Sequence, residues 1–209
     1  VALLIEQLQS EDPDTRLAAI VAVGRLGDAR ATLPLAALLG GDRTQAVAAA
    51  AALARIGDPR AFDALLPLLS HADAAVRQGA IGALNSLGHP DMAARVVGLL
   101  ASPDPLLRES AVRIAGYFGY ADAADAMIAR AGDSDEGVRR AAIEHLPFLD
   151  DARALAPLVQ ALTDPAAKVR AVAAQAFSDM RADAAREPLL AATRDPDAWV
   201  RYYAVRSLA

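Results

Sequence analysis

The feature that most constrains this chain of 209 residues is a dipeptide that recurs at a fixed interval. An apolar residue followed by arginine occurs with the arginine at positions 77, 108, 139, 170 and 201, so each lies 31 residues after the last. A constant period of this length is typical of repeat arrays, in which each repeat is one supersecondary unit packed against its neighbours. The period therefore predicts a stack of similar units rather than helices wrapped around one closed centre.

Glycines mark the end of a helix in several repeats. Each follows an apolar residue, and successive glycines lie 30, 31 and 31 residues apart. Glycine just past an apolar-periodic helix is a common C-terminal stop, because it adopts the left-handed conformation without steric cost. At the corresponding positions of the next two repeats, glycine is replaced by Asp150 and Arg181. The glycines are Gly27, Gly57, Gly88 and Gly119.

Proline pairs indicate where the second helix of a repeat begins. Asp or Ser caps the first free N–H groups of a helix, and Pro suits the first helical position, where no N–H is needed. The pairs predicted to open second helices are Asp12-Pro13, Ser102-Pro103, Asp164-Pro165 and Asp195-Pro196.

Between these marks each repeat is predicted to form two helices of about 10–15 residues joined by tight turns. Abundant alanine and leucine with 4% aromatic residues agree with an all-α fold and closely packed helices. We expect seven such hairpins in a single repeat domain over residues 1–209. The predicted first helices are 2–9, 29–39, 59–70, 90–101, 121–131, 151–162 and 182–193. The predicted second helices are 13–26, 43–56, 73–87, 104–118, 135–148, 165–179 and 196–208.

Paired helices of this kind resemble HEAT repeats. The resemblance rests on the pattern Asp-x-x-Val-Arg at 73–77 and 135–139, which opens the second helix, and on the Leu-Gly-Asp turn that follows a second helix. The short period resembles the subclass first noted in phycobilisome lyases. Prolines seven residues past the turn marker match the kinked first helix of that family. These prolines are Pro34, Pro157 and Pro188.

The resemblance covers the whole chain and implies a right-handed α-α superhelix, or α-solenoid, of about seven repeats. Repeat two departs from the pattern, since Gln45-Ala46 stands where other repeats carry the apolar-arginine pair. The first residue is Val1 rather than methionine, the last repeat is cut short, and both ends are apolar. We therefore expect a trimmed array, with further chain or a partner covering one or both ends.

Composition restricts the classes of partner. The formal net charge of -5 argues against general binding to nucleic acid, which depends on neutralising phosphates. No apolar run approaches the roughly 18–20 residues of a membrane span. The absence of cysteine excludes disulfides and thiolate metal sites, and agrees with a reducing, cytoplasmic location. We expect no cofactor, and a protein or peptide partner rather than a membrane, nucleic acid or a small molecule.

The resemblance implies that second helices line a concave groove. At about 100° per residue, positions +1, +5 and +9 from the repeated arginine point away from the apolar side of the helix, and +2 flanks them. In repeat three the opposite, apolar side comprises Val76, Ala80, Ile81, Leu84 and Leu87. Repeats one to three offer small apolar groove residues: Leu17, Ala18, Val21, Val47, Ala48 and Ala51. The candidate partner-binding residues in repeats four to seven are Glu109, Arg113, Tyr117, Arg140, Glu144, Phe148, Gln175, Trp199, Tyr202, Tyr203 and Arg206.

Aromatic residues beside arginine are typical of binding hot spots, so we expect a protein segment to lie along this groove. The alternative is a solvated face, because Glu109/Arg113 and Arg140/Glu144 are spaced to neutralise each other along one helix.

The repeated arginines also have two interpretations. They could form an anion-binding stripe, or they could join repeats, as Arg77 would by bridging to Asp73 or to Asp104 of the next repeat. The HEAT resemblance and the position beside the core favour a structural role. The arginines of this ladder are Arg16, Arg77, Arg108, Arg139, Arg170 and Arg201.

No catalytic or metal-binding pattern is found in the sequence. The histidines His71, His89 and His145 occupy different helix positions, and Glu144-His145 is a lone pair, with His145 expected to be partly buried. Deoxyhypusine hydroxylases, which share this repeat class, carry several His-Glu motifs, and HEAT-like DNA glycosylases carry a strongly basic groove. We therefore expect a non-enzymatic interaction module or scaffold. The resemblance leaves a bilin lyase-type subunit acting on a tetrapyrrole-carrying protein as the alternative, while the variation between repeats argues against an engineered consensus array.

Overall fold

The computed structural model describes residues 1–178 and 183–209, and these residues form 14 α-helices and short 3-10 segments with no strand. The predicted all-α fold of helical hairpins is confirmed. The chain divides into two compact units, Val1–Met92 and Ala93–Ala209, which are described separately below. Among the described residues, no helix is both long and apolar enough to cross a bilayer.

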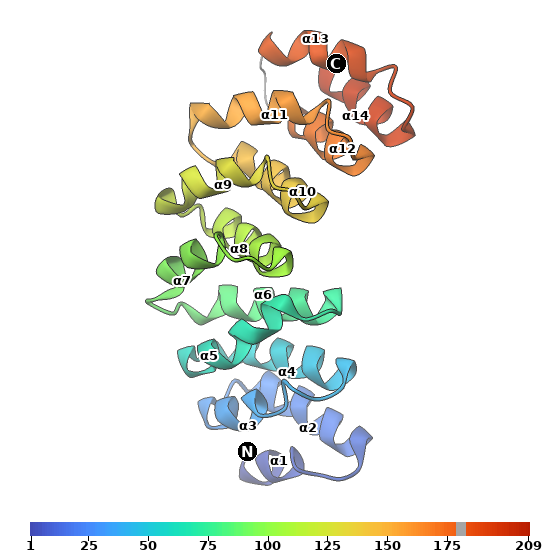
Figure 1. The fold of residues 1–209 in the computed structure, drawn as a ribbon. Coiled ribbons are helices and arrows are strands. Elements are labelled where there is room, and N and C mark those ends of the chain that lie inside the picture. The colour runs from blue at the N-terminus through green and yellow to red at the C-terminus, as the bar shows by residue number, and fades with distance from the viewer. Residues whose placement is uncertain (179–182) are drawn as a thin grey trace. The chain divides into compact units, whose positions relative to one another are not determined.

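The first unit stacks its helices in chain order (Figure 1). Its second helices pack against one another, α2 on α4 and α4 on α6. These helices are α2 (Pro13–Leu26), α4 (Arg43–Ile56) and α6 (Ala74–Leu87). The first helices are α1 (Ala2–Gln7), α3 (Thr32–Ala36) and α5 (Phe62–Leu65), with 3-10 segments at Ala29–Ala31, Pro59–Ala61 and Leu66–Ser70.

The second unit repeats this arrangement: α8 packs against α10, α10 against α12, and α12 against α14. These second helices are α8 (Pro105–Phe118), α10 (Glu136–His145), α12 (Ala167–Ala176) and α14 (Ala198–Leu208). The first helices are α7 (Met92–Leu99), which begins at the last residue of the first unit, α9 (Ala124–Arg130), α11 (Leu155–Ala161) and α13 (Arg186–Ala192). The 3-10 segments are Ala121–Ala123, Leu146–Phe148, Ala152–Ala154 and Asp183–Ala185.

The predicted glycine stops are confirmed. All four glycines of the series have a φ between 59° and 67°, the left-handed region that costs other residues free energy. Where the series lacks glycine the helix ends differently: α10 stops at His145 and continues as a 3-10 turn containing Pro147. The marker at Arg181 lies outside the described residues.

The proline pairs predict one helix start correctly and place three too early. Asp12 caps α2 by accepting the backbone N–H of Thr15, with Pro13 in the first helical position. In the other three repeats the Ser or Asp side chain accepts the N–H two residues later, which forms a turn that precedes the helix. The helices that begin later than predicted start at Pro105, Ala167 and Ala198.

In three first helices, α3, α11 and α13, a 3-10 segment changes to α geometry, and a proline lies just after the change. Pro34, Pro157 and Pro188 are each the third residue of an α segment. The first residues of an α-helix have no intrahelical acceptor for their N–H groups, so proline is tolerated there. The resemblance implied a kinked first helix, and the irregularity found in these helices is the 3-10 segment before each proline.

All five apolar positions predicted for the core face of α6 are buried.

Consecutive second helices approach closely where small residues meet. In the first unit, a Cβ added to Gly24 of α2 would lie 2.8 Å from both Cα and Cβ of Ala52 in α4. A backbone atom cannot move aside as a flexible side chain can, so glycine at this position permits the observed packing.

The variant Gly24→Ala should therefore lower the free energy of unfolding by about 1–3 kcal/mol, the usual cost of overpacking a well-filled interface. Gly82→Ala in α6 is the matched control, because a Cβ there meets no atom within 4 Å. That exchange should raise stability by about 0.5–1 kcal/mol through helix propensity. Thermal unfolding followed by circular dichroism measures both, and equal melting temperatures for the two variants would contradict the packing argument.

Candidate functional site

Large aromatic side chains are exposed on the second helices of the second unit. The exposed fraction is 67% for Tyr117 on α8, 76% for Phe148 after α10, and 64% and 53% for Trp199 and Tyr202 on α14. Side chains of this size are normally buried in part, so several exposed on one face indicate a surface that contacts something else. Helical periodicity predicted this outward orientation for Tyr117, Phe148 and Tyr202.

The rings of α14 hold one another in place. Trp199 stacks on Tyr203 with ring centres 6.1 Å apart and meets Tyr202 edge-on at 6.0 Å. Tyr203 is itself half-buried against the core of the unit. The exposed indole therefore has a defined position, which lowers the entropy that a partner would remove on binding.

Two hollows lie side by side along α12 and together form what we call the α12 groove. The hollow between α10 and α12 has a volume of about 370 Å³, and the one between α12 and α14 has a volume of about 320 Å³. Both are lined by Arg140, Val172 and Gln175, so they adjoin one another. The first is also lined by Glu144, Pro147, Phe148 and Ala176. The second is also lined by Ala167, Lys168, Ala171, Asp197, Trp199 and Tyr203.

The charged residues beside the groove form a network across two helices. Arg113 of α8 pairs with Glu109 at 3.1 Å and with Glu144 of α10 at 3.4 Å. Arg140 of α10 reaches back to Glu109 at 3.6 Å. The expected pair Arg140/Glu144 is therefore wrong, because the adjacent helix offers each residue a partner at shorter range than the next turn of its own helix.

The groove brings together six of the eleven candidate partner-binding residues. Glu109 and Arg113 adjoin it through their ion pairs, while Tyr117, Tyr202 and Arg206 are exposed but do not line it. The six lining candidates are Arg140, Glu144, Phe148, Gln175, Trp199 and Tyr203.

Sequence reasoning missed Lys168. It lies two residues before Arg170, which at 100° per residue is about 160° from that arginine, between the outward positions +5 and +9. Trp199 occupies the same position relative to Arg201. The helical wheel therefore contained the signal. The two flanking positions Ser110 and Ala141, expected to point outward, are buried instead.

The outward positions of the first unit carry no aromatic residue. Val21 and Ala51 are exposed there, while Leu17 and Val47 are half-buried. A hollow of about 130 Å³ lies beside Arg16 and Gln45. The small apolar character expected of repeats one to three is present, and it offers a partner less contact area than the α12 groove.

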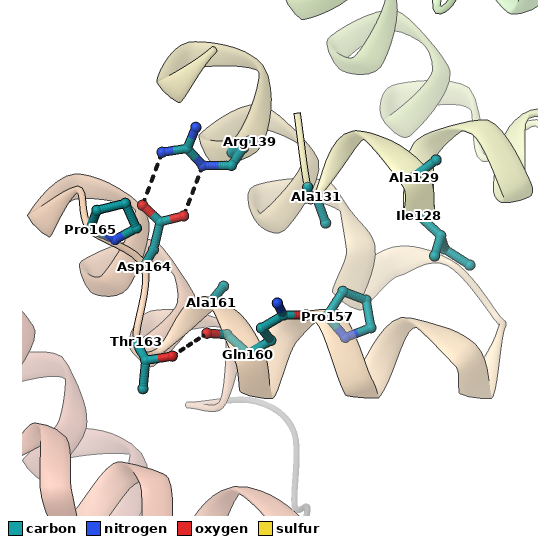
Figure 2. Close-up of a pocket in the computed structure, with 11 residues that line it drawn as sticks. Ile128, Ala129, Ala131, Arg139, Pro157, Gln160, Ala161, Thr163, Asp164 and Pro165 are labelled. Carbon is teal, nitrogen blue, oxygen red and sulfur yellow. Dashed lines mark hydrogen bonds and ion pairs between the residues drawn. The ribbon is translucent and has the colours of Figure 1, made fainter. Parts of the chain in front are cut away.

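A larger hollow, of about 540 Å³, lies between α9 and α11 and is not the candidate site (Figure 2). Ile128 and Ala131 face Pro157 and Ala161 across it. Its polar groups bond to one another: the guanidinium of Arg139 to Asp164, and the Thr163 hydroxyl to the Gln160 carbonyl oxygen (Figure 2). Few groups remain there to orient a ligand.

Three of the four ladder arginines of the second unit are saturated by acceptors within the chain, while the fourth, Arg201, is exposed and donates to the carbonyl oxygens of Asp195 and Pro196. In Arg108, Arg139 and Arg170, the Nε atom donates to one carboxylate oxygen of the aspartate 25 residues later and the Nη2 atom donates to the other, at 2.7–3.1 Å. Their Nη1 atoms donate to backbone carbonyls five and six residues earlier. The accepting aspartates are Asp133, Asp164 and Asp195. This saturation favours a structural role over an anion-binding stripe.

The register of these pairs differs from the expected one. The bridge proposed for Arg77 would join residues 27 apart, whereas the observed pairs are 25 apart and use the aspartate that precedes the helix cap. The expected contact between Arg77 and Asp73 is wrong as well. Asp73 pairs with Arg43, and Arg77 donates to the carbonyls of His71 and Ala72.

His145 is mostly enclosed, as expected from its helix position. Its ring packs against Gly116 of α8, where a Cβ would lie 2.4 Å from His145 Cγ. Burial lowers the pKa of the imidazole, while Glu144 on the same helix acts in the opposite direction. Within the described parts of the chain, no three His, Cys, Asp or Glu side chains converge to hold a metal ion.

A sequence profile of HEAT repeats matches residues 43–110, 94–178 and 155–209 in overlapping segments, which together cover most of the chain. The chain belongs to the HEAT-repeat family. The resemblance inferred from the 31-residue period is thus confirmed. Comparison with curated proteins finds no match.

Solved structures agree on the fold of this HEAT-repeat chain. A structure of Kap95p with RanGDP superposes with a TM-score of 0.77 at 15% identity, covering 99% of this chain and 32% of Kap95p. The complex of CpcE and CpcF of phycocyanin lyase from Nostoc sp. gives a TM-score of 0.51 at 21% identity, covering 100% of this chain and 94% of the other. At these identities the likeness concerns the fold alone.

Asp164→Asn tests the structural role of the arginine ladder. The exchange removes the charge that Arg139 needs in a partly buried position, so we expect the free energy of unfolding to fall by about 1–3 kcal/mol. Asp150→Asn, at an exposed residue without a partner among the described residues, should change it by less than about 0.5 kcal/mol. Urea unfolding followed by fluorescence of Trp199, the single tryptophan, reports on this unit. Equal midpoints for the two variants would count against the ladder.

His145 should make stability depend on pH between about 6.5 and the lower pKa that burial gives it. Above 6.5, its ordinary value, the imidazole is neutral in both states. As the pH falls below 6.5 the unfolded chain takes up a proton that the folded chain does not, so stability decreases. His145→Gln should flatten this part of the profile, with His71→Gln, at an exposed ring, as control. An unchanged slope in His145→Gln would refute the assignment.

Proposed function

We propose that this HEAT-repeat chain is a non-enzymatic interaction module that binds an extended protein segment along the α12 groove. The observation that carries the proposal is the placing of Phe148 and Trp199. Both are largely exposed, and they line two adjoining hollows that share Arg140, Val172 and Gln175.

The geometry suits a narrow, extended occupant. Neighbouring helices lie about 8–10 Å apart, and an extended chain rises about 3.3 Å per residue. Every second side chain of an extended segment points to the same side, about 6.6 Å after the last, so alternate side chains could enter the two hollows. Aromatic walls supply contact area, and Gln175 in the shared part offers an amide that can bond to a peptide backbone.

The charge network beside the groove supports binding over a bland solvated face. Glu109 and Glu144 are both engaged by Arg113, so a partner that covers them buries carboxylates that already have a counter-charge. The network neutralises itself, whereas the exposed faces of Phe148 and Trp199 remain in contact with water. Phe148 in particular makes no ring contact with any described residue.

A binding role agrees with the settings of the two solved relatives, each of which is seen with another protein. The bilin lyase-type alternative is not advanced, because the likeness to the phycocyanin lyase subunits bears on the fold alone. No described residue points to a tetrapyrrole.

Selection of random displayed peptides against the full chain tests the proposal. Phe148→Ala and Trp199→Ala should each weaken the selected peptides more than tenfold, as expected for exposed aromatic anchors, while the melting temperature stays within about 2 °C because little buried surface is lost. Leu190→Ala, at an exposed apolar residue of α13, is the matched control. If the selected peptides bind both groove variants as tightly as they bind the native chain, the proposal is wrong.

A further inference from the structure

We propose that the segment bound in the α12 groove is acidic and aliphatic, with a carboxylate that pairs with Lys168 and an apolar side chain that enters the hollow against Trp199. This inference rests on the proposed function and specifies its partner. It follows from the charges that remain unpaired in the groove and from the shape of the hollow between α12 and α14.

The carboxylates that line the groove are already occupied. Glu144 pairs with Arg113 at 3.4 Å. Asp197 caps α14 and accepts the backbone N–H groups of Trp199 at 2.9 Å and of Val200 at 3.1 Å. A basic partner would therefore meet carboxylates whose charge is already partly compensated, and would gain less from them than from unpaired ones.

The cations of the groove are not occupied to the same degree. Lys168 is exposed, lines the hollow between α12 and α14, and forms no hydrogen bond or ion pair with any described residue. Arg206, one turn beyond Tyr202 and Tyr203, is likewise exposed and unpaired among the described residues. Arg140 has one carboxylate partner there, at 3.6 Å. An acidic segment gains ion pairs without breaking any.

The hollow itself is apolar and shallow. Its floor consists of Ala167, Ala171 and Val172, and its wall is the exposed face of Trp199. Small side chains in the floor leave room for a branched aliphatic side chain, which loses contact with water there. A carboxylate on a neighbouring residue of the same segment then lies within reach of Lys168.

A peptide suits these features better than a nucleic acid. Tight binding to nucleic acid requires neutralising many phosphates, and its affinity grows with the number of cations engaged. Here two unpaired cations lie beside the groove of a chain with a net charge of -5.

Degenerate peptide pools test the chemistry of the partner. The pools contain leucine and alanine with aspartate, asparagine or lysine at random positions, and fluorescence anisotropy measures their binding to the full chain. We expect the aspartate pool to bind at least fivefold more tightly than the asparagine pool, and the lysine pool to bind most weakly. Lys168→Gln should remove most of this preference, about threefold for an exposed pair, and Lys168→Glu should reverse it. Arg186→Gln, at an exposed cation of α13, is the control.

A zero-length cross-link locates the contact. Lys168 is the single lysine of the chain, so carbodiimide activation of a peptide carboxylate yields an amide at Lys168 or at the N-terminal amine, with loss of water. Mass spectrometry should find aspartate-pool peptides joined to Lys168, and excess unlabelled pool should suppress the product.

The outcomes separate the two proposals. Groove-dependent peptides with no acidic preference, and no effect of Lys168→Glu, would overturn this inference and leave the proposed function standing. Peptides that bind regardless of Phe148 and Trp199 would overturn both. Binding of a single-stranded oligonucleotide more tightly than the aspartate pool, or a cross-link between two copies of the chain at Lys168, would assign the groove to another partner.

Discussion

Close approach between consecutive second helices is the constraint on which the rest of each unit depends. It is made possible by small residues at the contacts, as where Gly24 of α2 meets Ala52 of α4, and Gly116 of α8 meets the ring of His145. A helix packed on both sides in this way buries its flanks and its inner face, and one stripe of its surface remains exposed. In the second unit, the exposed stripe of α12 lines the α12 groove together with residues of α10 and α14. The groove is therefore a consequence of how the repeats pack, and its chemistry can vary without altering the fold.

The arginine ladder separates structural charge from charge that is free to act. Burial acts to raise the pKa of Asp164, but hydrogen bonds from Arg139 and from the N–H of Ala166 outweigh it and hold the pKa below its ordinary value of 3.8. The carboxylate therefore stays ionised, and the pair is lost only as the pH falls below that value. With Arg108, Arg139 and Arg170 engaged in this way, the cations left on the groove side of the unit are Lys168, Arg206 and in part Arg140, within the described residues.

The sequence predicted features that depend on one helix and failed on features that depend on its neighbour. Glycine stops, the apolar face of α6 and the outward direction of Phe148 and Tyr202 follow from local propensity and periodicity. The start of α12 does not, because Asp164 serves both as a turn acceptor and as the partner of Arg139 in the previous repeat. Likewise the partner of Glu144 lies on α8 rather than on its own helix. A single sequence specifies angles around a helix but not distances between helices.

The contrast between Tyr203 and Phe148 shows why the groove is better explained by contact than by folding. Tyr203 packs against the core and against Trp199, so its ring contributes to the stability of the unit. Phe148 is 76% exposed and gains little from folding, since the hydrophobic free energy scales with the area removed from water. It is the last residue of the 3-10 turn that contains Pro147. A large apolar side chain exposed at the edge of a hollow gains free energy when another surface covers it, and that is the property expected of a binding anchor.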